Sequence, residues 1–125
     1  MTSWTTEELA AIGAAEELDL QSRRADGTLR DPVTMWVVRH GDGLYVRAVK
    51  GRAGWYRGTR TAGDGRISSA GVARDVAFAA AAADAGLNDA LDAVYRDKYR
   101  SYPPSYTDSV VNDLARSSTI RLDPR

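Results

Sequence analysis

The chain has 125 residues, with 17 basic and 17 acidic side chains, a net charge of zero and 43% hydrophobic residues. That length suits one hydrophobic core, so we expect a single domain spanning residues 1–125 rather than two domains. The balanced charge provides no global field to hold nucleic acid or an anionic membrane, and we expect neither partner.

Cysteine is absent and histidine occurs once, as His40, which excludes disulfides, thiolate metal sites and cysteine nucleophiles. A lone histidine in a glycine turn argues against a serine–histidine triad. Asp84, Asp89 and Asp92 lack the spacing of a metal-binding loop, so we expect no metal. The N-terminus has neither a basic segment nor a long apolar run, which predicts a cytoplasmic protein without a signal peptide or transmembrane helix. These patterns identify no catalytic residue.

The chain opens with a predicted helix followed by a strand. The helix should begin near Thr5, because Thr5 and Glu8 have the spacing of a capping box, and should end around residues 13–15. Leu18 and Leu20 then alternate with polar residues, which predicts a half-buried strand.

A hairpin is the next predicted unit. Residues 33–38 are almost continuously apolar and β-branched, which predicts a strand covered on both faces. Residues 32–49 as a whole predict a β-hairpin that turns at a glycine-rich segment. Residues 50–58 are rich in glycine and arginine and predict a loop that could include one helical turn.

Residues 76–85 can be interpreted in two ways. The alanines at 77–83 have the highest helix propensity available. Alternation of Val72, Val76 and Phe78 with other residues instead favours a strand. At this point both interpretations remain open.

The rest of the chain predicts two helices and a closing strand. One helix should follow Gly86 and stop at Pro103, a second should run from about Pro104 to Leu114, and residues 118–122 alternate as a strand. With about six strands, a short N-terminal helix and a helical pair before the last strand, we predict an α+β domain built on a small antiparallel barrel.

The order of several segments resembles a known family: LDLQSRRADGTLRDP, WVVRHGDGLYVRAVKG, GWYRG, YRDKYRSYPPSY and TIRLDP. Over residues 16–124 the chain resembles the uncharacterised bacterial family domain of unknown function 2255, which is similar to the deazaflavin-dependent nitroreductases and the flavin-binding split barrels. The resemblance implies a split β-barrel in which residues 72–83 form a strand. It also implies a homodimer, because such relatives often pair to complete a cofactor site.

The resemblance further implies a cofactor, either flavin mononucleotide or the deazaflavin coenzyme. In the deazaflavin enzymes a G-R-K-S-G-x-x-R loop gathers cofactor phosphate and carboxylates. Residues 22–30 match this loop, and Arg23, Arg24 and Arg30 keep its positive charge. The loop departs from the pattern at its first glycine, its lysine and its hydroxyl residue, and Asp26 is inserted.

Two other segments are implied to contact the cofactor or the substrate. The family's ring-binding or phosphate-binding segment matches Lys50, Gly51, Trp55 and Tyr56, and a Y-P-x-x-Y pattern over the substrate side matches Tyr102 and Tyr106. Such aromatic residues are suited to line a flat apolar slot for a conjugated ring. Trp36, in contrast, falls within the apolar run and is assigned to the core.

The arginines also have a plain structural interpretation. A barrel would bring Arg47, Lys50, Arg52 and Arg57 near the arginine loop, where guanidinium groups match phosphate in a bidentate way. The alternative is a solvated surface in which the arginines pair with aspartates, since such pairs are common and nearly neutral in energy.

Three functions therefore remain open. The first is a small oxidoreductase whose flavin or deazaflavin carries the redox chemistry. The second is a non-catalytic relative that has no such cofactor and binds another small ligand or serves as a dimeric accessory protein. The third is a purely structural or interaction domain.

Overall fold

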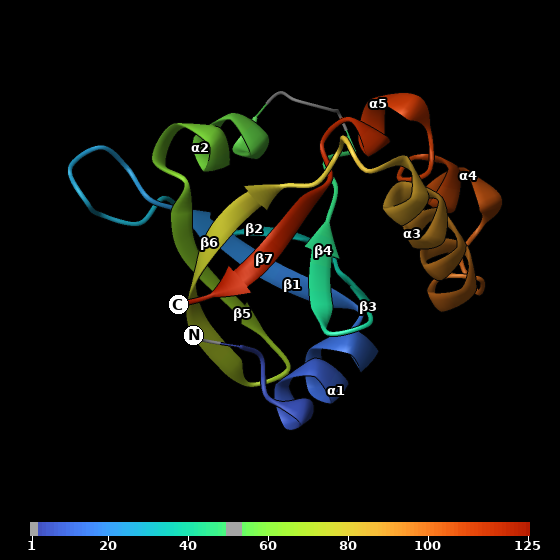
Figure 1. The fold of residues 1–125 in the computed structure, drawn as a ribbon, viewed down its shortest axis with the longest axis horizontal. Coiled ribbons are helices and arrows are strands. Elements are labelled where there is room, and N and C mark those ends of the chain that lie inside the picture. Colours follow the sequence, from blue (N-terminus) through green and yellow to red (C-terminus); the bar gives the residue numbers. More distant parts are fainter. Residues whose placement is uncertain (1–2, 50–53) are drawn as a thin grey trace.

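The structure, a computed structural model, describes residues 3–49 and 54–125. Seven strands form one antiparallel sheet in the order β2-β1-β5-β6-β7-β4-β3 (Figure 1). The strands are β1 Glu17–Ser22, β2 Val33–Trp36, β3 Val38–His40, β4 Gly43–Val46, β5 Asp64–Ser69, β6 Val72–Ala80 and β7 Ile120–Pro124. The helices are α1 Thr6–Ala14, α2 Trp55–Ala62, α3 Ala85–Lys98, α4 Pro104–Asp108 and α5 Asp113–Arg116.

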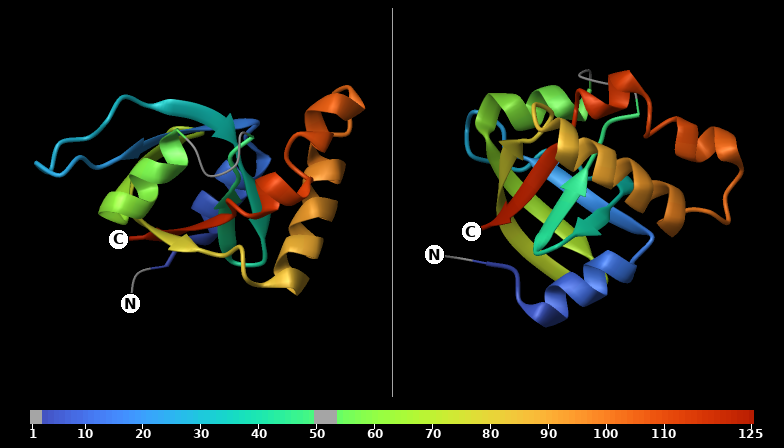
Figure 2. Two further views of the ribbon diagram at one scale, coloured as in Figure 1. Left: turned by 90° about the horizontal axis from the view of Figure 1, so that it is seen from above. Right: turned by 45° about the vertical axis from the view of Figure 1, so that its right-hand side comes forward.

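The sheet curls into a nearly closed barrel because its two edge strands are consecutive in the chain. β2 pairs with β1, β3 pairs with β4, and only Val37 separates β2 from β3. The two edges therefore come together at Val37 without hydrogen-bonding to each other. Helices α1 and α2 lie at opposite ends of the barrel, and α3, α4 and α5 gather along one side (Figure 2). The predicted α+β split barrel is confirmed, with seven strands rather than about six.

The apolar run at residues 33–38 is not the single, doubly covered strand that its composition predicts. It divides into β2 and β3, and Val33 is 37% exposed. The run divides because the N–H of Val37 donates to the hydroxyl of Tyr99 at 3.3 Å instead of to a neighbouring strand. The predicted hairpin is accordingly confined to β3 and β4.

Other local predictions are confirmed. The Thr5 hydroxyl accepts a hydrogen bond from the N–H of Glu8 at 3.1 Å, and the Glu8 carboxylate accepts one from the N–H of Thr5 at 2.9 Å, which completes the capping box of α1. The alanine-rich segment forms strand β6, as the family resemblance implies. It pairs with β5 on one side and β7 on the other, so two rows of hydrogen bonds override the helix propensity of alanine.

The helical region differs from its prediction. α3 ends at Lys98, before Pro103 is reached, and the single second helix is replaced by the short α4 and α5. Asn112 causes this break, because its side-chain oxygen accepts from the N–H of Ala115 at 2.9 Å and starts a new helix. The glycine-rich segment after residue 53 forms the two-turn helix α2, and residues 50–53 lie outside the described part of the chain.

Two apolar clusters make up the core. Inward-facing strand residues and α1 fill the barrel, and Trp4 closes one end by donating its indole N–H to the carbonyl of Leu122 at 2.9 Å. The second cluster packs α3 against β3 and β4 through Val38, Tyr45, Leu91, Tyr95, Tyr99 and Val110. Within the described residues, no helix has the length and apolar character needed to span a membrane.

Two glycine variants should separate a close backbone approach from ordinary helix propensity. A Cβ at Gly65 in β5 would overlap the carbonyl oxygen of Gln21, so we expect Gly65→Ala to destabilise the fold by about 3 kcal/mol or more. A Cβ at Gly86 in α3 meets only Asp84 at 3.6 Å, so Gly86→Ala should stabilise by about 0.5 kcal/mol. Urea denaturation measures both values, and equal midpoints for the two variants would contradict the packing described for β1 and β5.

Candidate functional site

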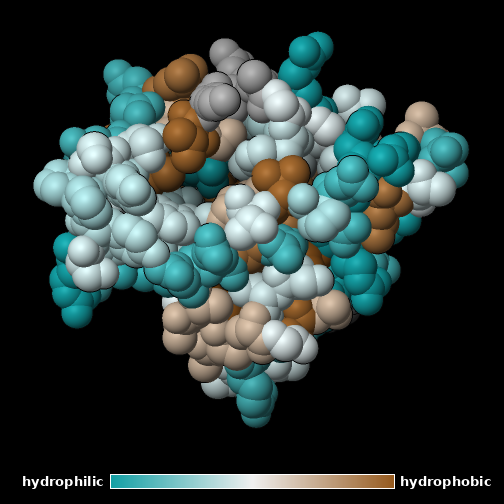
Figure 3. Space-filling view, turned by 180° about the vertical axis from the view of Figure 1, so that it is seen from behind, coloured by the Kyte–Doolittle hydropathy of each residue, from teal (hydrophilic) through white to brown (hydrophobic). Residues whose placement is uncertain are grey.

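A cavity of about 690 Å³ opens beside the split of the barrel, within the size range of small-molecule pockets. The free edge of β2, the end of β4, the start of α2 and the region of α4 all contribute to its lining. Three aromatic side chains from different elements face it: Trp36, Trp55 and Tyr106. We call this space the aromatic cavity. Figure 3 shows the molecule from behind, where patches of hydrophobic surface interrupt the hydrophilic face.

Arg47 is one of the residues that line the aromatic cavity. Its side chain is fully buried, and all five of its N–H groups are donated. The acceptors are the Thr119 hydroxyl at 3.0 Å, the Asp92 carboxylate at 2.5 Å, the Val110 carbonyl at 2.8 Å, and the carbonyl and side-chain oxygens of Asn88 at 3.1 and 2.9 Å. Because no donor is left over, Arg47 is a structural residue and not the anion-binding group suggested by its place near the arginine loop.

The Arg47 network extends into the helices. Asp92 uses its second oxygen to accept from Arg116 at 2.9 Å, which ties α5 to α3. The amide of Asn88 donates to the carbonyls of Ala81, Ala82 and Asp84, which joins the end of β6 to α3. The helices on this side of the barrel are therefore held by polar groups as well as by apolar contact.

A second cavity of about 440 Å³ is also lined by Trp55. We call it the arginine cavity, because Arg30 and Arg57 line it together with Asp31. Among the described residues, neither guanidinium has a carboxylate partner within ion-pair distance. Gly54 and Trp55 line both cavities, so the two spaces meet at the start of α2.

Local structure keeps the arginine cavity open. A Cβ at Gly58 would lie 2.5 Å from the Ser22 hydroxyl and 3.3 Å from Nε of Arg30, so only glycine lets these groups approach α2. Gly54 precedes α2 with a φ of 62° and gives the helix no side-chain cap. Within the described part of the chain, the first N–H groups of α2, next to the Gly54 and Trp55 that line both cavities, have no side-chain acceptor.

Only one of the three arginines predicted for the cofactor loop lines a described cavity. Arg30 does so, whereas Arg23 donates to Asp64 at 3.3 Å and to the carbonyl of Gly27 at 2.9 Å. Arg24 donates to the carbonyl of Leu29 at 2.8 Å. These two side chains hold their own turn together. Lys50 and Gly51, also predicted to bind cofactor, lie outside the described residues.

The aromatic residues predicted for the site also differ in whether they line a cavity. Trp55 and Tyr106 line the aromatic cavity, whereas Tyr56 is buried in the barrel core. Tyr102 does not line the cavity but packs against two of the rings that do, with its ring centroid 5.6 Å from that of Tyr106 and 5.1 Å from that of Trp36. Assigning Trp36 to the core missed a cavity residue, because nothing in the apolar run shows which of its positions lies on a free sheet edge.

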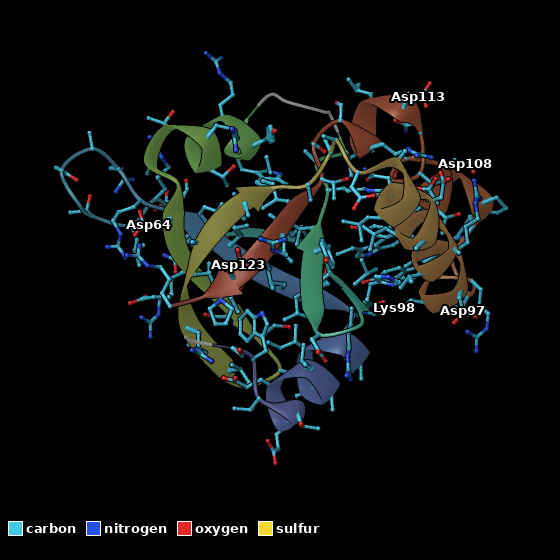
Figure 4. The ribbon with its side chains drawn as sticks, in the orientation of Figure 1. Asp64, Asp97, Lys98, Asp108, Asp113 and Asp123 are labelled. Carbon is cyan, nitrogen blue, oxygen red and sulfur yellow. The ribbon has the colours of Figure 1, made fainter. Side chains whose placement is uncertain are left out.

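Lys98 and Tyr99, at the C-terminal end of α3, contact the segment that joins the two barrel edges. Figure 4 labels Lys98 at this end of α3. Nζ of Lys98 donates to the carbonyl of Val37 at 2.5 Å, and the ring of Tyr99 stacks on Trp36 with centroids 3.7 Å apart. Burial lowers the pKa of Lys98 to about 8, partly opposed by the negative charge of Glu16. Within the described residues, no group of three or more histidine, aspartate or glutamate side chains is placed to hold a metal ion.

A family model described as "Uncharacterized protein conserved in bacteria (DUF2255)" matches residues 8–122. The chain belongs to this family. The resemblance read from the sequence is thereby confirmed, and no curated protein matches the chain.

Two solved structures show that the fold of this family member is shared. The crystal structure of the conserved hypothetical protein Rv2991 from Mycobacterium tuberculosis superposes with a TM-score of 0.69 at 11% identity, over 100% of this chain and 82% of that chain. A structure titled "F420 Reductase" superposes with a TM-score of 0.57 at 14% identity, over 93% of this chain and 91% of that chain. At such identities the likeness concerns the fold.

Replacing Arg47 should unfold this family member more readily than replacing any surface arginine. Arg47→Met removes the donor to one oxygen of the Asp92 carboxylate and one of the two donors to the side-chain oxygen of Asn88, so we expect a loss of about 3 kcal/mol in unfolding free energy. Arg47→Lys should not restore it, because an ammonium cannot replace five fixed donors. Arg96→Met, at an exposed pair with Asp108, is the control and should cost less than about 0.5 kcal/mol by urea denaturation.

Lys98 should make stability rise with pH in the alkaline range. Its pKa of about 8 in the folded chain lies below the ordinary 10.5, so between these values the unfolded chain holds a proton that the folded chain has released. Stability then increases with pH, because the unfolded state binds more protons. We expect the wild type to gain stability relative to Lys98→Met as pH rises from about 7.5 to 10, measured by urea midpoints. A difference independent of pH would contradict this assignment.

Proposed function

We propose that the chain binds a flavin or deazaflavin in the split of the barrel and acts as a small oxidoreductase. The observation that supports this proposal most strongly is the position of Trp55, which lines both the aromatic cavity and the cavity lined by Arg30 and Arg57. A cofactor made of a flat ring and an anionic tail needs these two environments side by side.

The residues fit such a molecule. Trp36, Trp55 and Tyr106 offer apolar ring faces in a volume of about 690 Å³, which is ample for a conjugated ring system. The guanidinium groups of Arg30 and Arg57 match the geometry of phosphate oxygens, and the uncapped start of α2 adds N–H donors near the same place. Asp31 offsets part of this positive charge.

The cofactor, when bound, would supply the hydride or electron transfer. The part of the protein is then to hold the tail with arginine, to orient the ring against the aromatic walls and to keep water away from it. One structure of similar fold is titled an F420 reductase, which favours the deazaflavin coenzyme of the two candidates.

A second function is favoured by the hydrogen bonds within the arginine loop, residues 22–30. Arg23 and Arg24 donate within their own turn, and Asp26 accepts from the N–H and hydroxyl of Thr28 at 3.0 and 2.6 Å. A loop organised around its own hydrogen bonds suits a non-catalytic relative that binds a different small ligand in the same cavities. Cofactor titration separates the two functions.

Cofactor affinity should depend on Arg57 and Trp55. We expect flavin mononucleotide or the deazaflavin coenzyme to raise the melting temperature in a saturable way, because a ligand that prefers the folded state stabilises it. Arg57→Gln should weaken binding about tenfold through the loss of charge-assisted hydrogen bonds, and Trp55→Ala should abolish the shift.

Arg60→Gln is the matched control, since Arg60 belongs to the same helix and lines neither cavity. Its affinity for the cofactor should stay within about twofold of the wild type. If neither cofactor stabilises the wild type, the oxidoreductase proposal is wrong and the non-catalytic function takes its place.

A further inference from the structure

Among the described residues that line the aromatic cavity, the available charge is negative. In that part of the chain two charged side chains line it, Glu17 and Arg47. The guanidinium of Arg47 has donated all five N–H groups elsewhere and offers none to a ligand. The carboxylate of Glu17 is exposed, and in the described ranges 3–49 and 54–125 it enters no ion pair or side-chain hydrogen bond.

The register of the sheet places Glu17 beside an aromatic ring. Glu17 in β1 is directly paired with Trp36 in β2, so both side chains emerge on the same face of the sheet. Trp55 from α2 and Tyr106 from α4 line the same cavity, and Tyr106 is 53% exposed. The carboxylate thus belongs to a cavity lined by three aromatic rings.

The neighbouring polar groups add to the negative character. Asp19 and Thr34 form the next pair on the same face, and the Thr34 hydroxyl donates to the Asp19 carboxylate at 2.6 Å. Thr34 lines the cavity, but its proton is already used, so it presents an acceptor rather than a donor. The oxygen atoms on this wall therefore favour a ligand that brings positive charge or hydrogen-bond donors.

We propose that the aromatic cavity selects planar, positively charged ligands and that Glu17 is the specificity-determining residue. Aromatic faces attract cations through their quadrupole, and a carboxylate beside them adds a Coulomb attraction that an anionic or neutral ring does not receive. Anions are favoured in the arginine cavity, at Arg30 and Arg57. As a statement about the substrate, namely a cationic heteroaromatic ring, this inference rests on the proposed function. The charge selectivity itself can be measured without any cofactor.

Three probes of equal ring size test the selectivity: N-methylquinolinium, quinoline and quinoline-3-carboxylate, which are cationic, neutral and anionic at pH 7.5. Tryptophan fluorescence and calorimetry on the full chain at low salt give the three affinities. We expect the cation to bind about three- to tenfold more tightly than the neutral ring, and the anion to bind most weakly. Added salt should reduce this preference because it screens the carboxylate.

Two variants with the same change in net charge locate the effect. Glu17→Gln should bring the affinities for the cation and the neutral ring within about twofold of each other. Glu7→Gln, in the first turn of α1 and away from the cavity, should keep the full preference. The inference is overturned if the cation preference survives in Glu17→Gln, if the wild type shows no such preference, or if no probe binds saturably.

This outcome is separable from that of the proposed function. If the probes discriminate by charge while neither cofactor binds, the selectivity of the cavity stands, and the oxidoreductase proposal, with its cationic substrate, fails. If a cofactor binds while the probes do not discriminate, the oxidoreductase proposal stands and the role of Glu17 fails.

Discussion

The rest of the structure depends on the complete pairing of one buried cation. A guanidinium removed from water costs several kcal/mol unless each of its donors finds an acceptor, and Arg47 finds five in α3, at the start of β7 and after α4. All of these acceptors must be in place together, since a partly satisfied buried network is less stable than an apolar core. Arg47 therefore links the barrel to its helical side, and it fixes Val110, which lines the aromatic cavity.

The aromatic cavity exists because the two edge strands of the barrel do not pair with each other. β2 and β3 are neighbours in the chain but lie at opposite edges of the sheet, and the chain passes between them at Val37. The contacts from Lys98 and Tyr99 hold this passage in place of strand pairing. The free edge of β2 is thus left open to the aromatic cavity, which Trp36 lines.

Much of the fold could be predicted because its signals are local. The capping box of α1 and the alternation in β1 depend on neighbouring residues, and the family resemblance decided β6 where propensity could not. The break at Val37 could not be predicted, because the residues before and after it have the same apolar, β-branched character. Likewise, the sequence around Arg47 does not reveal which groups accept its hydrogen bonds, because these groups lie 41 to 72 residues away in the chain. Of the residues that line the two cavities, Trp55, Tyr106 and Arg30 were already candidates from the sequence, whereas Trp36 and Glu17 required the register of β1 and β2.

The indole shared by the two cavities has a consequence for thermodynamic linkage. Trp55 is a wall of both spaces, and its backbone starts α2 directly after a glycine with positive φ. A ligand that changes the rotamer of this side chain from within one cavity would also change the space offered by the other cavity. Two ligands bound on either side are consequently not independent, and the factor by which the first changes the affinity of the second is the factor by which the second changes that of the first.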